Sequence, residues 1–182
     1  GMEFASFFCS MGVKVTIIEM LDEILGGMDK ELSAMLRAEY AKRGVQFLLN
    51  TKVIFLEGKE NSVKVTFENA EGENVLAAEK VLLSVGRKPV TNGYGLENLN
   101  LKRTERGTIW VNDQLQTSVE GVYACGDLNG RSLLAHTAVR EAEVAVHAIL
   151  GKDDAMAYNA IPAVVYTNPE IAGVGATEES LK

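Results

Sequence analysis

Two carboxylates follow short apolar runs that have the length and composition of buried strands. Glu19 ends the β-branched run Val13–Glu19, and Asp127 follows the apolar run Gly121–Cys125 in a Gly126-Asp127 pair. In open α/β sheets, ligands bind beyond the carboxyl ends of the strands. A carboxylate there can accept hydrogen bonds from ribose or polyol hydroxyls. A solvated strand end and a generic Gly-Asp turn are the alternatives.

A dinucleotide-binding βαβ unit is the first chemistry that this spacing suggests. Glu19 lies eighteen residues after Gly1, behind a helix and a strand. In such units an acid about 20 residues beyond the glycine-rich turn holds the adenosine ribose. The carboxylate would repel a 2′-phosphate, and no arginine follows it before Arg37. The pattern therefore predicts NAD as the ligand of Glu19.

A helix start comes shortly after Asp127. The segment Leu133–Ala138 opens a helical stretch that runs to about Leu150 and stops at Gly151. Backbone N–H groups at a helix start suit an anion or an electron-rich ring. His136 is a candidate for such a contact through its backbone, while its side chain is interpreted as a packing or surface group.

The cysteines and histidines form no redox or acid–base constellation. Cys9 and Cys125 lie far apart and form no C-x-x-C pair, so both are interpreted as buried structural thiols. His147 lies between Val146 and Ala148 and is interpreted as a packing or surface residue. No metal site is predicted.

The elements that must position these residues alternate between helix and strand. Asp29 is the predicted N-cap of the second helix, whose expected buried stripe is Leu32, Met35, Leu36 and Tyr40. An antiparallel meander is expected from Lys52 onward. The predicted helices are Glu3–Met11, Asp29–Arg43 and Ala135–Leu150; the predicted strands outside the meander are Val13–Glu19, Val45–Leu49, a buried Lys80–Val85, Gly121–Cys125 and Ala160–Thr167.

Composition limits the possible partners. The 182 residues are 47% hydrophobic and 24% charged, with a net charge of −7 spread along the chain. Nucleic acid and acidic membrane surfaces are therefore not expected partners. No apolar run approaches the roughly 20 residues of a membrane span. Because we identify no signal peptide and few cysteines, a cytoplasmic location is expected.

Together these features resemble the pyridine nucleotide–disulfide oxidoreductase family over essentially the whole chain. The family has a proline where Glu120 stands, and we expect only a local change of turn there. The matching positions are Gly1, Glu3, Ala5, Gly12 and Glu19 in the nucleotide unit, Ser84–Thr91 in the S-x-G-R-x-P-N-T loop, Tyr94–Glu97, Val111–Asp127 in the second FAD motif, and Leu134–His136 beside the flavin.

The resemblance implies an α/β, Rossmann-like FAD/NAD(P)-binding fold with an inserted antiparallel β-meander, incomplete at both ends. It implies an NAD-binding domain over 1–112 without its first strand, a returning segment of the FAD domain over 113–155, and the start of a dimer-interface domain over 156–182. The implied cofactor-binding residues are Gly1, Glu3, Glu19, Gly86, Arg87, Gly126, Asp127, Leu134, Ala135 and His136.

The C-terminal segment narrows the resemblance to one branch of the family. Tyr166-Thr167-Asn168-Pro169-Glu170 is most similar to the dihydrolipoyl dehydrogenase branch, which oxidises dihydrolipoamide with NAD through FAD and a redox disulfide. That branch implies a homodimer and a component of a 2-oxo acid dehydrogenase complex. The family's C-x-x-x-x-C pair and its His–Glu pair are not in this chain, so we expect the chain alone to be inactive and to bind FAD poorly. Alternatives are a mercuric or glutathione reductase-like enzyme, an NADH oxidase, or a non-catalytic nucleotide-binding module.

Overall fold

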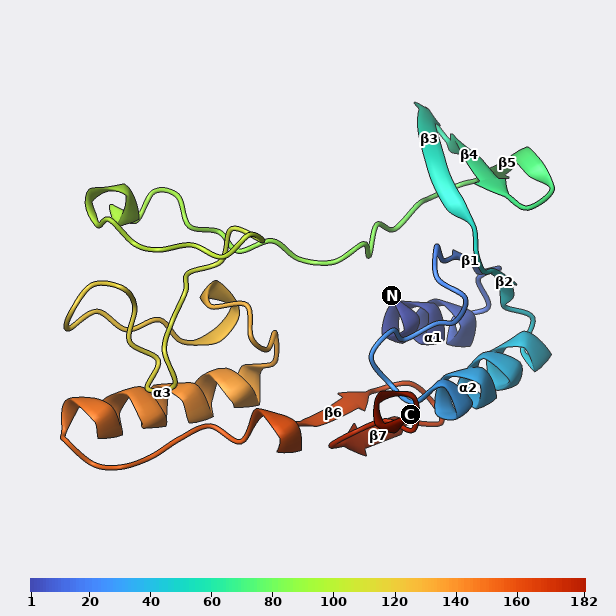
Figure 1. Cartoon of the computed structure of the whole chain (residues 1–182). Helices are drawn as coiled ribbons and strands as arrows, with labels where there is room; N and C mark the ends of the chain where they lie inside the picture. The colour runs from blue at the N-terminus through green and yellow to red at the C-terminus, as the bar shows by residue number, and fades with distance from the viewer. The chain divides into compact units, whose positions relative to one another are not determined.

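The computed structural model describes residues 1–182 (Figure 1). Helix α1 spans Met2–Ser10 and confirms the first predicted helix. The chain divides into two units: residues 1–85 with 162–182, and residues 86–161. In the first unit, Met2 and Ala5 of α1 are buried. Phe4, Phe7 and Phe8 lie exposed on the same helix, and the Phe8 ring contacts the rings of both Phe4 and Phe7.

Helix α2 spans Lys30–Lys42 and begins as predicted at Asp29, whose carboxylate accepts a hydrogen bond from the Glu31 N–H at 3.0 Å. Leu36 and Tyr40 are each only 1% exposed. The prediction for Met35 was wrong: it is 63% exposed, and Ser33 is buried instead. Each residue turns an α-helix by about 100°, so Met35 lies well away from the face that Leu36 and Tyr40 share with Ser33.

A two-stranded parallel sheet lies beside these helices. Strand β1, Thr16–Ile18, pairs with β2, Gln46–Leu48, and Ile17 faces Phe47 in the register. Both strands are shorter than the predicted Val13–Glu19 and Val45–Leu49. The helices and this sheet enclose the core of the first unit, whose buried apolar members are Met2, Ala5, Ile24, Leu36, Tyr40, Val45 and Ile171.

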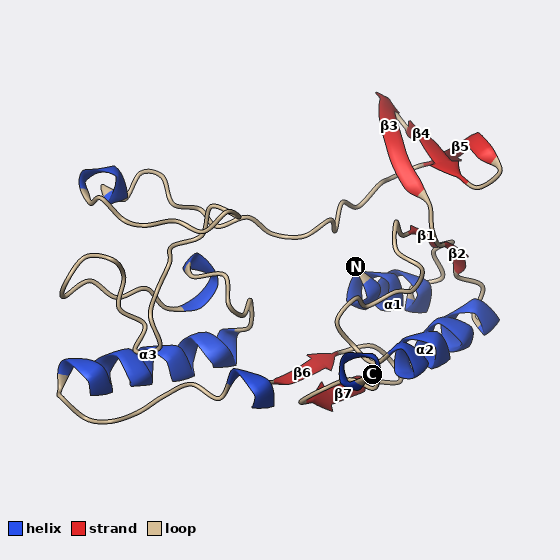
Figure 2. Ribbon diagram, in the orientation of Figure 1, coloured by secondary structure: helices blue, strands red, loops and turns tan.

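The predicted meander is confirmed as three antiparallel strands, drawn in red in Figure 2. They are β3, Lys52–Lys59, β4, Ser62–Asn69, and β5, Gly72–Ala78. The next prediction, a buried strand over Lys80–Val85, was wrong. The segment forms no strand, and Val85 is 90% exposed. A strand needs a neighbour for its backbone N–H and C=O groups, and no segment of this chain pairs with these residues.

The chain returns to the first unit in a hairpin. Strand β6, Pro162–Val165, pairs antiparallel with β7, Ile171–Val174. The strand predicted over Ala160–Thr167 is thus confirmed with shorter bounds. Ile171 joins the same core as α1 and α2.

The second unit is built on helix α3, Ala135–Ile149, which confirms the third predicted helix. The strand predicted over Gly121–Cys125 was wrong, since the segment forms a single bridge between Tyr123 and Gln116. The apolar residues of this segment pack against α3, although the backbone of the segment is irregular and forms no strand. The buried core is Ile109, Val111, Leu115, Ala124, Val144 and Ala145.

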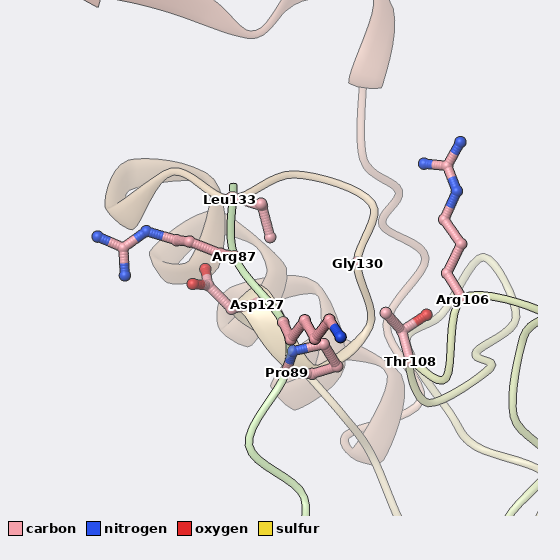
Figure 3. Close-up of a pocket in the computed structure, with 8 residues that line it drawn as sticks. Arg87, Pro89, Arg106, Thr108, Asp127, Gly130 and Leu133 are labelled. Carbon is pink, nitrogen blue, oxygen red and sulfur yellow. The ribbon is translucent and has the colours of Figure 1, made fainter. Parts of the chain in front are cut away.

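One close approach in this unit requires glycine. Gly130 has φ +71°, and a Cβ atom there would lie 2.5 Å from Cγ2 of Thr108 (Figure 3).

None of the helices is both long and apolar enough to span a bilayer.

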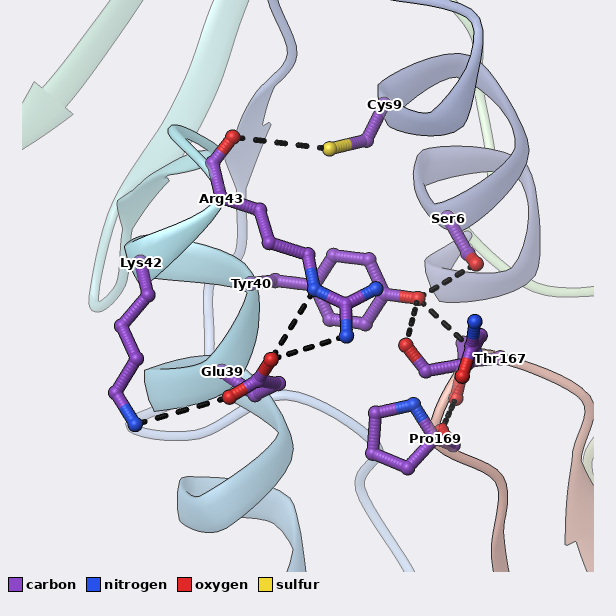
Figure 4. Close-up of polar contacts among 9 residues, drawn as sticks. Ser6, Cys9, Glu39, Tyr40, Lys42, Arg43, Thr167 and Pro169 are labelled. Carbon is purple, nitrogen blue, oxygen red and sulfur yellow. Dashed lines mark hydrogen bonds and ion pairs between the residues drawn. The ribbon is translucent and has the colours of Figure 1, made fainter.

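A buried hydroxyl joins distant parts of the first unit (Figure 4). The Tyr40 hydroxyl lies 2.6 Å from Oγ of Ser6 on α1. It also lies 3.1 Å from both the backbone oxygen and the backbone nitrogen of Asn168, in the loop between β6 and β7. One side chain of α2 therefore satisfies polar groups of both α1 and the hairpin.

We expect Tyr40→Phe to lower the free energy of unfolding by about 1–3 kcal/mol, because it removes the partner of the buried Ser6 hydroxyl and of the part-buried Asn168 backbone. Urea unfolding followed by circular dichroism measures the loss. Tyr166→Phe is the matched control, since Tyr166 is exposed in the same unit. Equal stability of the two variants would contradict the importance of the hydroxyl.

Candidate functional site

Glu19 is held at the carboxyl end of β1. Its backbone N–H donates to the Leu48 carbonyl, and its own carbonyl accepts from Thr51, each at 2.9 Å. Its Oε1 accepts a hydrogen bond from the Leu21 N–H at 2.9 Å. Oε2 makes no hydrogen bond within the chain, so one carboxylate oxygen is available to a ligand hydroxyl.

Gly1 and Ser84 lie together at the start of α1. Gly1 is the N-cap, without a side-chain cap, and a Cβ atom there would lie 3.5 Å from Cβ of Ser84. Two motifs far apart in sequence therefore meet at this helix start. Glu3 has a partner that the sequence did not indicate: its Oε1 accepts from the Tyr166 N–H at 2.9 Å and ties α1 to the end of β6.

The Gly126-Asp127 pair forms a 3-10 turn in the second unit, over Gly126–Leu128. Gly126 has φ +75°, and a Cβ atom there would lie 3.1 Å from Cβ of Ala138 on α3. Any other residue there would be strained by the left-handed backbone and would push Ala138 away by a few tenths of an ångström. Asp127 is exposed, and its carboxylate makes no hydrogen bond within the chain.

Glu141 on α3 holds this turn in place, and sequence reasoning missed it. Its side chain is fully buried. One carboxylate oxygen accepts hydrogen bonds from the Gly126 N–H at 2.5 Å and from the Asn129 amide at 2.8 Å. The other accepts from the Tyr158 hydroxyl at 2.7 Å. The available signal was its helical spacing from Thr137 and Val144, which places a charge on the buried face of α3.

Tyr158 and Arg131 complete this cluster. Burial, and then the hydrogen bond to Glu141, raise the pKa of Tyr158 to about 12, although Arg131 opposes the shift. The Arg131 guanidinium lies 5.2 Å from the centre of the Tyr158 ring. It also donates to the Val111 carbonyl at 2.8 Å, which connects the cluster to the core.

The start of α3 has no side-chain cap. Leu134 is the N-cap residue, and its carbonyl accepts the first helical hydrogen bond, from Ala138. The Thr137 hydroxyl is 3.0 Å from Oγ of Ser132. Leu134, Ala135 and His136 thus begin the helix eight residues or so beyond the Gly126 turn, as the sequence predicts.

Neither cysteine is placed for redox chemistry. Cys9 lies in the first unit, with Sγ 3.9 Å from the Arg43 carbonyl, and Cys125 lies in the second. Both are half-buried and free. Burial and the nearby Glu141 raise the pKa of the Cys125 thiol, which keeps it in its weakly nucleophilic protonated form. His147 pairs with Asp154 at 2.7 Å in a partly exposed cluster that includes Arg140.

One pocket in the second unit brings Arg87 and Asp127 together (Figure 3). Its volume is about 140 Å³. Gly86, with φ +106°, leads into the loop that forms one side. Glu19 belongs to the other unit. No group of His, Cys, Asp and Glu residues is arranged to hold a metal ion. The lining residues are Arg87, Lys88, Pro89, Arg106, Thr108, Asp127, Gly130 and Leu133.

Comparisons with known proteins agree on one family. The sequence model of the pyridine nucleotide-disulphide oxidoreductases matches residues 1–142. Dihydrolipoyl dehydrogenase of Geobacillus stearothermophilus is 42% identical over the whole chain, and mitochondrial dihydrolipoyl dehydrogenase 1 of Arabidopsis thaliana is 39% identical. The chain spans only 39% and 36% of their lengths.

Solved structures give the same answer. LpdA from Mycobacterium tuberculosis superposes with a TM-score of 0.87 at 28% identity, over 97% of this chain and 38% of its own. The HOCl-induced flavoprotein disulfide reductase RclA from Escherichia coli, as its Cu(II) complex, also gives 0.87, at 30% identity over 100% of this chain and 41% of its own. The α/β, Rossmann-like fold with its inserted meander is thereby confirmed.

We expect Glu141→Gln to lower the free energy of unfolding by about 3 kcal/mol, because an amide replaces charge-assisted acceptors with weaker ones. The pKa of Tyr158 should fall from about 12 toward its usual value. Chemical unfolding and an ultraviolet titration of tyrosine measure the two effects. Glu143→Gln, on the exposed side of α3, is the control; a similar loss in both variants would contradict the role of Glu141.

Gly126→Ala should also destabilise the second unit, by about 2 kcal/mol, because it adds both a left-handed backbone penalty and a clash with Ala138. Gly151→Ala is the control, since Gly151 has φ +66° but open space around its Cβ position. Thermal unfolding of both variants separates the two contributions. If the two variants lose the same amount of stability, the contact with Ala138 contributes nothing to the effect of Gly126→Ala.

Proposed function

The chain belongs to the pyridine nucleotide-disulphide oxidoreductase family, and we propose that it forms part of a dihydrolipoyl dehydrogenase. The observation that carries the proposal is identity of 39–42% to enzymes of that name across the whole chain. The reaction would oxidise the two thiols of dihydrolipoamide to a disulfide and transfer two electrons and one proton to NAD⁺, giving NADH and releasing the second proton.

Glu19 is the proposed ribose acceptor of the NAD site. Its position at the end of β1 and its unbonded Oε2 fit a ribose hydroxyl. Gly1, at the uncapped start of α1, would allow a diphosphate to approach the helix N-terminus. Gly86 would leave room for the dinucleotide. Glu3 would lie near the nicotinamide, anchored by Tyr166.

The FAD site is proposed to involve the second unit. Asp127 would accept a hydrogen bond from the ribityl chain, which fits its exposed and unbonded carboxylate, and Gly126 would set the turn. Leu134, Ala135 and His136 would present backbone N–H groups to the flavin, and the uncapped helix start fits that role. Arg87 would contribute to cofactor binding from the pocket. When bound, FAD would relay two electrons between dithiol and nicotinamide.

The larger assembly is likewise a proposal. We propose an NAD-binding domain over residues 1–112, a segment of the FAD domain over 113–155 and the start of an interface domain over 156–182. The whole protein would be a homodimer that serves a 2-oxo acid dehydrogenase complex. A cytoplasmic location stays a prediction, because the Arabidopsis relatives are named mitochondrial.

The complete reading frame that contains this segment should form NADH from dihydrolipoamide and NAD. Glu19→Gln should raise KM for NAD about tenfold, since a charged acceptor of ribose hydroxyls is lost. The same variant should reduce the preference of the enzyme for NAD over NADP. Glu31→Gln, at an exposed position, is the control. Oxidation of NADPH by glutathione disulfide or mercuric ion, without activity on dihydrolipoamide, would contradict the proposal.

A further inference from the structure

The dipeptide Asn-Gly occurs twice in the chain, at Asn92-Gly93 and at Asn129-Gly130. An asparagine before glycine can lose its side-chain amide without an enzyme, because a glycine has no Cβ to keep its backbone nitrogen from reaching the asparagine Cγ. The reaction needs a side chain that is free to turn and room for a five-membered ring. The surroundings of the two pairs therefore decide which of them reacts.

Asn92-Gly93 meets both requirements. The two residues are exposed and lie in a loop outside any helix or strand. Neither the Asn92 side chain nor the Gly93 N–H makes a hydrogen bond within the chain. Apart from the chain neighbours of Gly93, no atom lies within 4 Å of the position that a Cβ atom of this residue would take. A ring can therefore close here without a clash and without breaking any contact.

Asn129 is held in place instead. Its side chain is buried, with only 4% exposure. Its amide nitrogen donates to Glu141 at 2.8 Å and to the Ala124 carbonyl at 3.2 Å, and its Oδ1 accepts from the Arg131 N–H at 2.9 Å. Attack by the Gly130 nitrogen would require the amide to leave these partners. The same dipeptide is thus protected at one place and open at the other.

The charge near Asn92 also favours the reaction. The guanidinium of Arg103 donates to Oγ1 of Thr91, the residue before Asn92, at 3.0 Å. Arg103 makes no ion pair within the chain. An unpaired cation favours nearby anionic forms. Here these are the deprotonated Gly93 nitrogen that attacks and the carboxylate that is formed.

We propose that Asn92 is a site of spontaneous deamidation and that the fold protects Asn129 from the same reaction. The Gly93 nitrogen loses its proton to solvent and attacks Cγ of Asn92. The new N–Cγ bond closes a succinimide ring, and the side-chain nitrogen leaves as ammonia. Water then opens the ring at either carbonyl and gives aspartate or isoaspartate, with no oxidation or reduction.

The product differs from the starting chain in charge and in backbone length. Either product adds one negative charge to a chain that already carries −7. Isoaspartate also inserts a methylene group into the main chain of the loop. The reaction involves no cofactor, so it is independent of the proposed function.

Ageing of the full chain in mildly alkaline buffer, followed by digestion and mass spectrometry of the peptides, tests the assignment. Asn92 should convert at least about tenfold faster than Asn129, since breaking even one buried hydrogen bond reduces the reactive population by about that factor. In urea, where the fold is lost, the two pairs should convert at similar rates. Equal rates in the folded chain, or an Asn92 that stays intact, would overturn the proposal. A difference that persists in urea would show that the fold does not protect Asn129.

Isoelectric focusing of variants identifies the source of the added charge. Asn92→Gln should remove most of the acidic species that form on ageing, because a glutamine would have to close a larger ring. Asn159→Gln is the matched control, at an exposed asparagine of the same unit that precedes alanine, and it should leave these species unchanged. Acidic species that persist in Asn92→Gln, or disappear in the control, would contradict the assignment.

Discussion

A buried carboxylate fixes the geometry of the second unit. Glu141 is removed from water, and a charge in that position is tolerated only when donors surround it. Gly126, Asn129 and Tyr158 supply those donors. The turn that carries Asp127 is therefore attached to α3 by its backbone, so that the side chain of Asp127 is left exposed. The position of the candidate cofactor acceptor depends on a residue that itself need touch no cofactor.

In each unit, one polar side chain on a helix connects segments that lie far apart in the sequence, but the chemical group differs between the units. In the second, a charged acceptor on α3 gathers backbone and side-chain donors from a loop that forms almost no ladder. In the first, a neutral hydroxyl on α2 connects α1 to the hairpin of β6 and β7. The neutral group costs less to bury, and there it accompanies a larger apolar core. Backbone N–H groups outside a ladder need other acceptors, and a carboxylate with several lone pairs can accept from more than one of them.

Local pattern predicted most of the elements, and long-range pairing decided the rest. Helical spacing gave α1, α2 and α3, and the Asp29 cap was read directly from sequence. Alternation gave the meander, because each of its strands pairs with its neighbour in the chain. Lys80–Val85 and Gly121–Cys125 have strand composition, yet strands form only where a partner lies alongside. Glu19 lies at the end of strand β1, as its place in the sequence indicated, whereas Asp127 follows a segment that forms only a single bridge. Glu141 belongs to no motif, and only its helical spacing from Thr137 and Val144 marks it as buried.

The three carboxylates show why position alone does not identify a binding residue. Glu141 has its acceptor capacity used by the protein, so it can only position other groups. Glu19 has one oxygen bonded to Leu21 and the other unbonded, which fixes its orientation and still leaves an acceptor. Asp127 has no partner within the chain but faces a pocket with unpaired cations. A carboxylate whose oxygens are already bonded can only position other groups, whereas one with an unbonded oxygen at the surface can still accept a hydrogen bond from a ligand.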